Sequence, residues 1–263
     1  MSEDGASPSP QAELARLAGT NGRGALATVV GPEGHEAMGR KLLIREDGSS
    51  SGGLGADRLD AAARTVCEEL LWAERSELRE LEGAEVFVDV VAPPPRLFVL
   101  GAVDYAAALC RMARAAGWRP YVCDPRTAFA TPERFPEAEE VLAAWPDEAF
   151  ARLGIDRATY IAVLTHDPKL DDAALTIALR SDAAYVGAMG SRRAQQRRRE
   201  RLLEAGVTEA ELARTSAPIG LDLGATSPEE TALSIMAEVV AVRNDRDGGR
   251  LQTAPGRIHE VGA

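Results

Sequence analysis

Residues 96–106 read RLFVLGAVDYA: an apolar strand, a glycine at its end, and the start of a helical stretch. Dinucleotide-binding folds place a loop of the pattern G-x-G-x-x-G/A at this point, where glycines let the backbone approach a pyrophosphate. Here the register puts Gly101, Val103 and Ala106 at the three positions. The tight turn and the close helix–strand packing are retained, but Val103 fills the space beside the phosphates. The stretch predicts a Rossmann-type sheet with an altered phosphate loop.

Repeated strand–helix units follow this stretch. Each predicted strand is a short apolar run, which is typical of parallel strands that are buried on both faces. The predicted strands and helices cover residues 96–101, 104–117, 119–124, 160–167, 171–181, 183–190, 191–206 and 227–243. Strands that alternate with helices over short connections predict a doubly wound parallel sheet.

The chain before this sheet has a different pattern. Strands are predicted at 25–30, 41–46 and 85–92, a flexible glycine-rich loop at 48–56 and a long helix at 57–81. Three consecutive prolines then break the chain, because proline cannot continue a central strand. The predicted fold class is α/β, with a disordered lead (1–10), a small N-terminal α+β domain (11–92), a proline linker (93–95) and a Rossmann-like domain (96–263).

Unusual residues stand at the carboxyl ends of the predicted parallel strands, where such sheets bind their ligands. Asp124 lies 23 residues after Gly101, near the usual spacing of the carboxylate that binds an adenosine ribose. Asp124 would repel a 2′-phosphate and Arg126 would offset that repulsion, so NAD and NADP both stay open. The predicted cofactor-binding residues are Gly101, Ala102, Val103, Asp124, Arg126, Thr165, Gly187, Gly190, Ser191 and Arg192.

Thr165, His166 and Asp167 are the sharpest polar cluster of the sequence. Histidine exchanges protons near neutral pH, and a neighbouring carboxylate can orient it. His166 and Asp167 are therefore the predicted catalytic pair. In the alternative interpretation, Asp167 only caps the following loop and His166 is a polar packing residue.

A helix begins directly after the predicted strand 183–190, with Gly190, Ser191 and Arg192 at its start. Helix N-termini with small residues bind anions, so a phosphate can lie here. An ordinary capped helix explains the same pattern. The arginines further along residues 192–201 are interleaved with polar residues and favour a solvated helix face over nucleic-acid binding.

Composition limits the remaining possibilities. The chain of 263 residues has a formal net charge of −11, which disfavours nucleic acid as a partner. Its three cysteines form no C-x-x-C pair, so they suit a reducing cytoplasm, and no metal site is predicted. No apolar run approaches the length of a membrane span. The sequence predicts a cytoplasmic protein without a membrane segment.

Several strings together resemble the XdhC/CoxI family, whose members pair a small N-terminal domain with a Rossmann domain. The strings are LATVV, KLLIREDG, RLFVLG, VCDPR, LTHDPKLDDAAL, YVGAMGSRR, PIGLDLGATSPEETALSIMAEVVA and GRIHE, in the family's order. The resemblance implies a cytoplasmic helper that binds the molybdenum cofactor, supports its sulfuration and delivers it to a molybdenum hydroxylase such as xanthine dehydrogenase. It also implies self-association into a homo-oligomer.

Three departures from the family pattern bear on this function. The family's glycine-rich loop carries a cysteine where GGLGADRLD (52–60) has Arg58. LEGAEV replaces a GCGG-like turn before the strand at 85–92, and GAVDYA replaces a GxGHxA pattern. Arginine cannot supply a thiolate ligand or carry a persulfide. Handling of a sulfurated cofactor is therefore not expected of this chain.

These observations leave two functions open, and whether the chain is an enzyme stays open with them. The first is an NAD(P)-linked oxidoreductase acting on a small-molecule substrate, with His166 and Asp167 transferring the proton beside hydride transfer. The alternative is an accessory protein that binds a molybdopterin-type molybdenum cofactor and inserts it into a partner hydroxylase. A regulatory nucleotide-binding module is a third, weaker interpretation.

Overall fold

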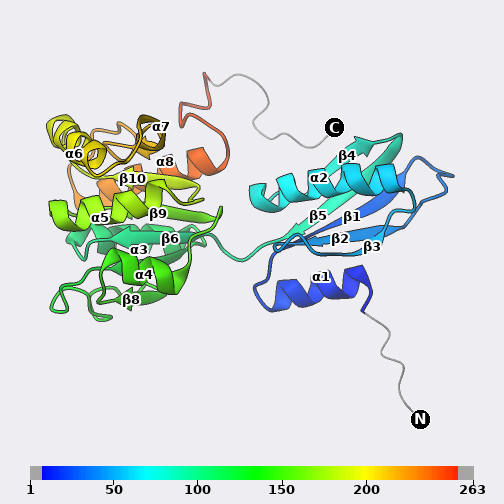
Figure 1. Cartoon of the computed structure of the whole chain (residues 1–263), viewed down its shortest axis with the longest axis horizontal. Helices are drawn as coiled ribbons and strands as arrows, with labels where there is room; N and C mark the ends of the chain where they lie inside the picture. Colours follow the sequence, from blue (N-terminus) through cyan, green and yellow to red (C-terminus); the bar gives the residue numbers. More distant parts are fainter. Residues whose placement is uncertain (1–7, 254–263) are drawn as a thin grey trace, which may run out of the picture. The chain divides into compact units, whose positions relative to one another are not determined.

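The computed structural model describes residues 8–253, which form two compact units divided between Pro93 and Pro94 (Figure 1). The division falls within the three-proline stretch. Most of the predicted lead and the end of the predicted second domain, including the string GRIHE, lie outside the described residues. Within the described part of the chain, no helix is long and apolar enough to cross a membrane.

The first unit is a five-stranded antiparallel sheet with one helix on each face. Its elements are α1 (Pro10–Gly19), β1 (Gly24–Gly31), β2 (Lys41–Arg45), β3 (Ser50–Gly53), α2 (Asp57–Ala73), β4 (Glu77–Leu81) and β5 (Ala84–Val91), with the strand order β3-β2-β1-β5-β4. Side chains alternate along β1, so that Ala25 and Ala27 pack under α2 while Leu26 packs with Leu14 of α1. This alternation gives each face of the sheet a separate small core.

Two predicted segments of this unit differ from the structure. The helix predicted at 57–81 ends at Ala73, where Glu74 adopts the left-handed conformation with φ +54°. The remainder forms β4, which pairs with β5 across a two-residue turn at Glu82 and Gly83, both with positive φ. The predicted flexible loop contains a strand, because Ser50–Gly53 pairs with β2.

The second unit is a six-stranded parallel sheet with helices on both faces, which confirms the predicted fold class. Its strands are β6 (Arg96–Leu100), β7 (Arg119–Cys123), β8 (Glu140–Leu142), β9 (Thr159–Val163), β10 (Tyr185–Ala188) and β11 (Thr215–Ser216). Its helices are α3 (Asp104–Ala115), α4 (Pro146–Leu153), α5 (Pro168–Leu179), α6 (Arg192–Glu204), α7 (Glu209–Leu212) and α8 (Pro228–Arg243). The strand order is β11-β10-β9-β6-β7-β8.

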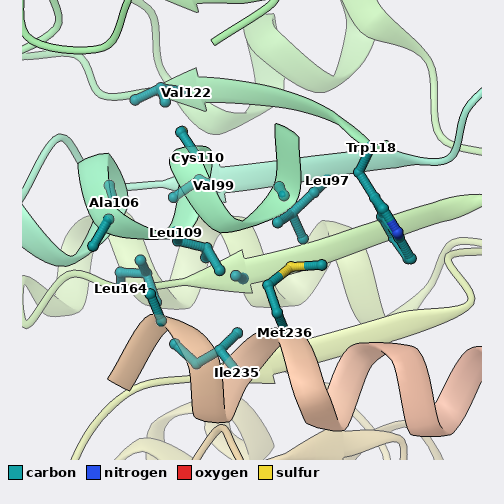
Figure 2. Close-up of a cluster of buried hydrophobic side chains, with 14 of the residues drawn as sticks. Leu97, Val99, Ala106, Leu109, Cys110, Trp118, Val122, Leu164, Ile235 and Met236 are labelled. Atoms are coloured by element: carbon teal, nitrogen blue, oxygen red, sulfur yellow. The ribbon is translucent and has the colours of Figure 1, made fainter. Parts of the chain in front are cut away.

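Buried apolar side chains fill both faces of this sheet. On one face, Leu109 of α3 meets Ile235 and Met236 of α8 over the strand residues Leu97 and Val99 (Figure 2). On the other face, residues of α4, α5 and α6 form a second core. The order of strands reverses between β9 and β6, so α3 and α5 leave the carboxyl edge toward opposite faces. This switch point is where open α/β sheets form their ligand crevice.

Candidate functional site

The loop that leaves β6 is fixed by a close contact with Thr165, which follows β9. Gly101 has φ +112°, and a Cβ at this position would lie 2.4 Å from Cγ2 of Thr165. Its N–H donates to the carbonyl of Cys123 at 2.8 Å, and Leu164 N–H donates to the carbonyl of Leu100 at 2.9 Å. Gly101 is therefore required both by its backbone conformation and by the space available.

The carboxylate of Asp124 is fully occupied by donors from the chain itself. Oδ2 accepts from the N–H of Ala102 at 2.8 Å and from Nη2 of Arg126 at 2.6 Å. Oδ1 accepts from the N–H of Arg126 at 2.9 Å and from its Nε at 2.8 Å. Asp124 is only 1% exposed. It braces the altered phosphate loop and does not face an open ribose site.

These contacts also set the charge of Asp124. Burial by itself raises the pKa of a carboxyl, but the hydrogen bonds from Arg126 and Ala102 outweigh that effect, so the pKa of Asp124 lies below its ordinary value. The hydrogen bond to Asp124 also raises the pKa of the Arg126 guanidinium. The pair is ionised at neutral pH.

Arg134 is a site residue that the sequence spacing did not indicate. Its Nη1 donates to the carbonyl of Ala102 at 3.1 Å. The guanidinium of Arg126 lies 4.8 Å from the ring centroid of Phe129, and that of Arg134 lies 5.7 Å from the same ring. Phe129 is 45% exposed. Two cationic groups and an exposed aromatic ring therefore stand next to the loop 101–103.

The predicted catalytic pair is not assembled in this structure. Asp167 is the N-cap of α5, where its Oδ1 accepts from the N–H of Lys169 at 3.0 Å. His166 is exposed, and it makes no hydrogen bond to Asp167 among the residues that the structure describes. The capping interpretation explains Asp167, and the proton-transfer role of His166 stays a prediction.

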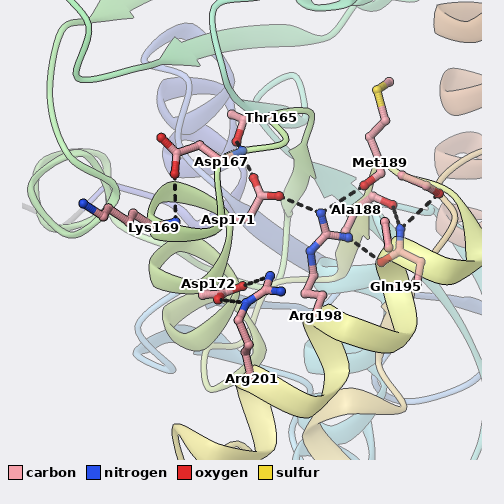
Figure 3. Close-up of polar contacts among 12 residues, drawn as sticks. Thr165, Asp167, Lys169, Asp171, Asp172, Ala188, Met189, Gln195, Arg198 and Arg201 are labelled. Atoms are coloured by element: carbon pink, nitrogen blue, oxygen red, sulfur yellow. Dashed lines mark hydrogen bonds and ion pairs between the residues drawn. The ribbon is translucent and has the colours of Figure 1, made fainter.

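Thr165 belongs instead to a buried network that links α5 to α6 (Figure 3). Its hydroxyl donates to Oδ1 of Asp171, and Oδ2 of Asp171 accepts from Nη2 of Arg198 at 2.6 Å. Arg198 also donates to the carbonyl of Met189 at 3.0 Å and to Gln195. Burial raises the pKa of Asp171, while the hydrogen bonds from Thr165 and Arg198 act in the opposite direction.

The strand end of β10 is held by the same network. Nε2 of Gln195 donates to the carbonyl of Gly190 at 3.3 Å, and Gly190 itself has φ +135°. Ser191 caps α6, because its Oγ accepts from the N–H of Ala194 at 3.3 Å. Arg192 is exposed on the first turn.

Gly187 lies within β10, where a Cβ would stand 2.5 Å from Cδ1 of Ile219. Direct contacts thus join Gly101 to Thr165, and Asp124 to Ala102 and Arg126, whereas Gly187, Ser191 and Arg192 lie outside these contacts.

The three cysteines are buried, and burial raises the pKa of each thiol to about 12. They pack in separate places, Cys67 in α2, Cys110 in α3 and Cys123 at the end of β7. Arg58, which replaces the family cysteine, is exposed in the first turn of α2. Within residues 8–253, no cluster of histidine, cysteine, aspartate and glutamate could hold a metal ion.

Comparisons with known proteins match most of the chain to one family. Residues 97–239 match the XdhC Rossmann domain, and residues 17–82 match the XdhC and CoxI family. The chain is 31% identical to the uncharacterized protein YqeB of Escherichia coli K12 over 90% of its own length and 47% of that protein. A probable xanthine dehydrogenase subunit of Bacillus subtilis is 28% identical over 60% of this chain and 46% of that one. The chain thus spans about half the length of both relatives.

A third relative is similar in length. The molybdenum cofactor insertion chaperone PaoD of Escherichia coli K12 is 27% identical, with 85% of both chains covered. A crystal structure of a xanthine dehydrogenase from Bacillus halodurans superposes with a TM-score of 0.54 at 18% identity and covers 94% of this chain and 98% of that one. At that identity the likeness concerns the fold alone. Since family models match both units and the parallel sheet has the matching architecture, the chain belongs to the XdhC and CoxI family.

Proposed function

We propose that this chain binds the molybdenum cofactor and helps to insert it into a hydroxylase of the xanthine dehydrogenase type. The similarity to PaoD over 85% of both chains supports this role. The comparisons offer no support for the predicted NAD(P)-linked oxidoreductase. The homo-oligomer and the cytoplasmic location remain predictions.

The observation that carries the proposal is the occupied carboxylate of Asp124. A dinucleotide needs this group to accept hydrogen bonds from its ribose hydroxyls. Here Ala102 and Arg126 already supply four donors, so a ribose would first have to displace Arg126. The site is therefore better suited to a phosphate-bearing ligand without that ribose contact.

The groups beside the loop 101–103 fit such a ligand. Val103 is the N-cap of α3 and supplies no side-chain cap, so the first N–H groups of this helix are available to an anion. Arg126 and Arg134 add guanidinium donors, each beside a carboxylate: Arg126 bonds to Asp124, and Nη2 of Arg134 lies 3.5 Å from Oδ1 of Asp104. Phe129 adds an exposed ring for a planar heterocycle. The bound cofactor would supply the redox chemistry of the hydroxylase that receives it.

The role of the chain itself is to hold and orient this cargo. Asp124 fixes Arg126 through two side-chain hydrogen bonds, so the guanidinium is presented without a large loss of rotamer freedom on binding. The three thiols are buried and protonated, so no cysteine of this chain is expected to carry the sulfur of a sulfurated cofactor. Delivery without sulfur transfer is the function that these residues support.

The test is co-purification from cells that synthesise the molybdenum cofactor. Anaerobically purified protein should carry molybdenum, measured by elemental mass spectrometry, together with a pterin, measured by fluorescence after oxidation. Arg134→Gln should lower the amount of both several-fold. Arg152→Gln is the matched control, because Arg152 is an exposed arginine of α4 that does not contact the loop. Bound NAD(P) in place of a pterin, or equal loss in both variants, would overturn the proposal.

A further inference from the structure

Helix α8 is apolar on its outer side as well as on its buried side. Ile235 and Met236 point toward α3 and belong to the core of the second unit (Figure 2). Leu233 and Val240 lie away from that core and are 53% and 39% exposed. Ala237 stands between them and is half-buried. These three side chains form the outer ridge of α8, where a helix at a protein surface normally carries polar residues.

The polar side chains in the middle of α8 are bonded inside the second unit instead. Oγ of Ser234 donates to the carbonyl of Leu221 at 2.5 Å. Glu238 accepts from the N–H of Gly220 at 2.8 Å and from the hydroxyl of Tyr185. The helix thus directs its central polar groups to its own chain and its leucine and valine outward. This distribution is expected of a helix that another apolar surface covers.

The outer ridge is suited to contact with a second copy of itself. Leu233 and Val240 are seven residues apart, which is close to two helical turns, so they lie on one side of α8. In a twofold contact between antiparallel helices, Leu233 of each chain meets Val240 of the other, because such an interface repeats every contact. Ala237 then lies near the axis, where its small side chain lets the helices approach closely.

The charges at the two ends of α8 favour the same arrangement. Glu229 and Glu230 lie in the first turn and Arg243 lies in the last. Hydrogen bonds from the N–H groups of Thr226 and Ser227 lower the pKa of Glu230, so it is ionised at neutral pH. Two antiparallel copies of α8 place an acidic end beside a basic end twice, whereas two parallel copies place like charges together.

We propose that α8 forms an interface between two copies of this chain, with the two outer ridges packed antiparallel around a twofold axis. Leu233 packs on Val240 of the partner subunit, and the acidic first turn faces the basic last turn across the contact. This interface gives the expected homo-oligomer a definite surface. It is independent of the proposed cofactor function, and either can fail without the other.

Sedimentation equilibrium of the full chain measures the dissociation constant of the dimer. Leu233→Glu or Val240→Lys alone should raise this constant at least about tenfold, because each places two charges in an apolar contact. The double variant should recover much of the loss, since the introduced carboxylate and ammonium then face each other at two places. The two positions are about 10 Å apart along one helix, so recovery reports a pair between chains.

Val30→Glu is the matched control, because Val30 is a 46% exposed apolar residue of the first unit. It should leave the dissociation constant unchanged, and circular dichroism should show that every variant is folded. A wild-type chain that stays monomeric at its highest soluble concentration would overturn the proposal. A double variant no better than the single variants, or equal weakening by Val30→Glu, would overturn it too.

A cross-link tests the position of the axis. Ala237→Cys should form a disulfide between two chains under mild oxidation, because this residue stands opposite its own copy. The three native cysteines are buried, so they do not compete. Val30→Cys should give no more cross-linked dimer than the wild type does. A non-reducing gel with equal amounts of dimer for Ala237→Cys and Val30→Cys would contradict the antiparallel contact of α8.

Discussion

Gly101 shows at the residue scale how the altered phosphate loop keeps its shape. Alanine there must adopt φ +112° and place a Cβ 2.4 Å from Thr165 Cγ2. The backbone strain costs about 1–3 kcal/mol, and relieving the clash costs about 1–3 kcal/mol more. Gly117 isolates the first of these effects, since it has φ +80° and open space where its Cβ would be.

Urea unfolding should therefore rank the two variants. Gly101→Ala should lower the free energy of unfolding more than Gly117→Ala, and Gly117→Ala should lie between it and the wild type. A Gly101→Ala protein as stable as the Gly117→Ala protein would mean that the loop can move away from Thr165.

Asp124 gives a prediction for the pH dependence of stability. Because its pKa in the folded state lies below the unfolded value of about 4, its contribution is fully present above that pH and is lost as the pH falls through the folded pKa. Asp124→Asn should destabilise the protein by about 1–3 kcal/mol at pH 7. The difference from wild type should shrink as the pH falls below about 4.

Denaturant unfolding between pH 7 and pH 3 measures this difference. Asp182→Asn is the control, because Asp182 is an exposed carboxylate. A gap between wild type and Asp124→Asn that stays constant down to pH 3 would show that the charge of Asp124 contributes nothing.

The position of Asp124 could be predicted from the sequence, but its role could not. Spacing from Gly101 placed it at the end of the second parallel strand, which is correct. Its partners include Arg126, two residues away, and Ala102, which the fold brings to it across the sheet. Spacing alone does not reveal whether a carboxylate is free for a ligand or already bonded to the chain.

Helices α5 and α6 are joined at the element scale by the buried pair Asp171–Arg198. Removing one partner leaves the other buried and unpaired, so Arg198→Met should cost about 3–5 kcal/mol. The double variant Asp171→Leu with Arg198→Met should recover much of that loss, because neither charge remains. Chemical denaturation of the wild type, both single variants and the double variant gives the coupling energy. Additive losses in the double variant would contradict a direct pair.

The errors in predicting elements have local physical causes. The apolar spacing of α2 continues through Leu78 and Leu81, so periodicity extended the helix past Ala73. The turn of Glu82 and Gly83 carries the positive φ values of a tight hairpin, but glutamate is not the asparagine or aspartate that signals such turns. β3 contains only serine and glycine, and pairing with β2 makes it a strand despite its weak propensity.

The parallel sheet was easier to predict than the N-terminal unit. Strands buried on both faces read as continuous apolar runs, and β9 is buried at every position. The short edge strands β8 and β11 lack such runs, so they were missed. The site followed the same rule: residues at the ends of central strands were found, whereas Arg134 was not, because it lies in an irregular segment.

The chain as a whole should behave as two folding units. Each has its own sheet and its own buried cores, and the division falls between Pro93 and Pro94. A fragment of residues 94–253 should therefore fold alone. Circular dichroism and a cooperative urea transition test this prediction, with the fragment 94–239, which removes the last turn of α8, as a shortened comparison. A fragment 94–253 without a cooperative transition would contradict it.

The burial of all three cysteines determines how this protein responds to redox-active molecules. Sulfenic acids and mixed disulfides form from accessible thiolates, and these thiols are both protonated and covered. Cycles of oxidation and reduction in the surroundings should therefore leave its cysteine thiols unchanged. The protein can therefore bind a redox-active molecule without thiol chemistry of its own. Neither peroxide nor a change in the glutathione pool should regulate it through a cysteine.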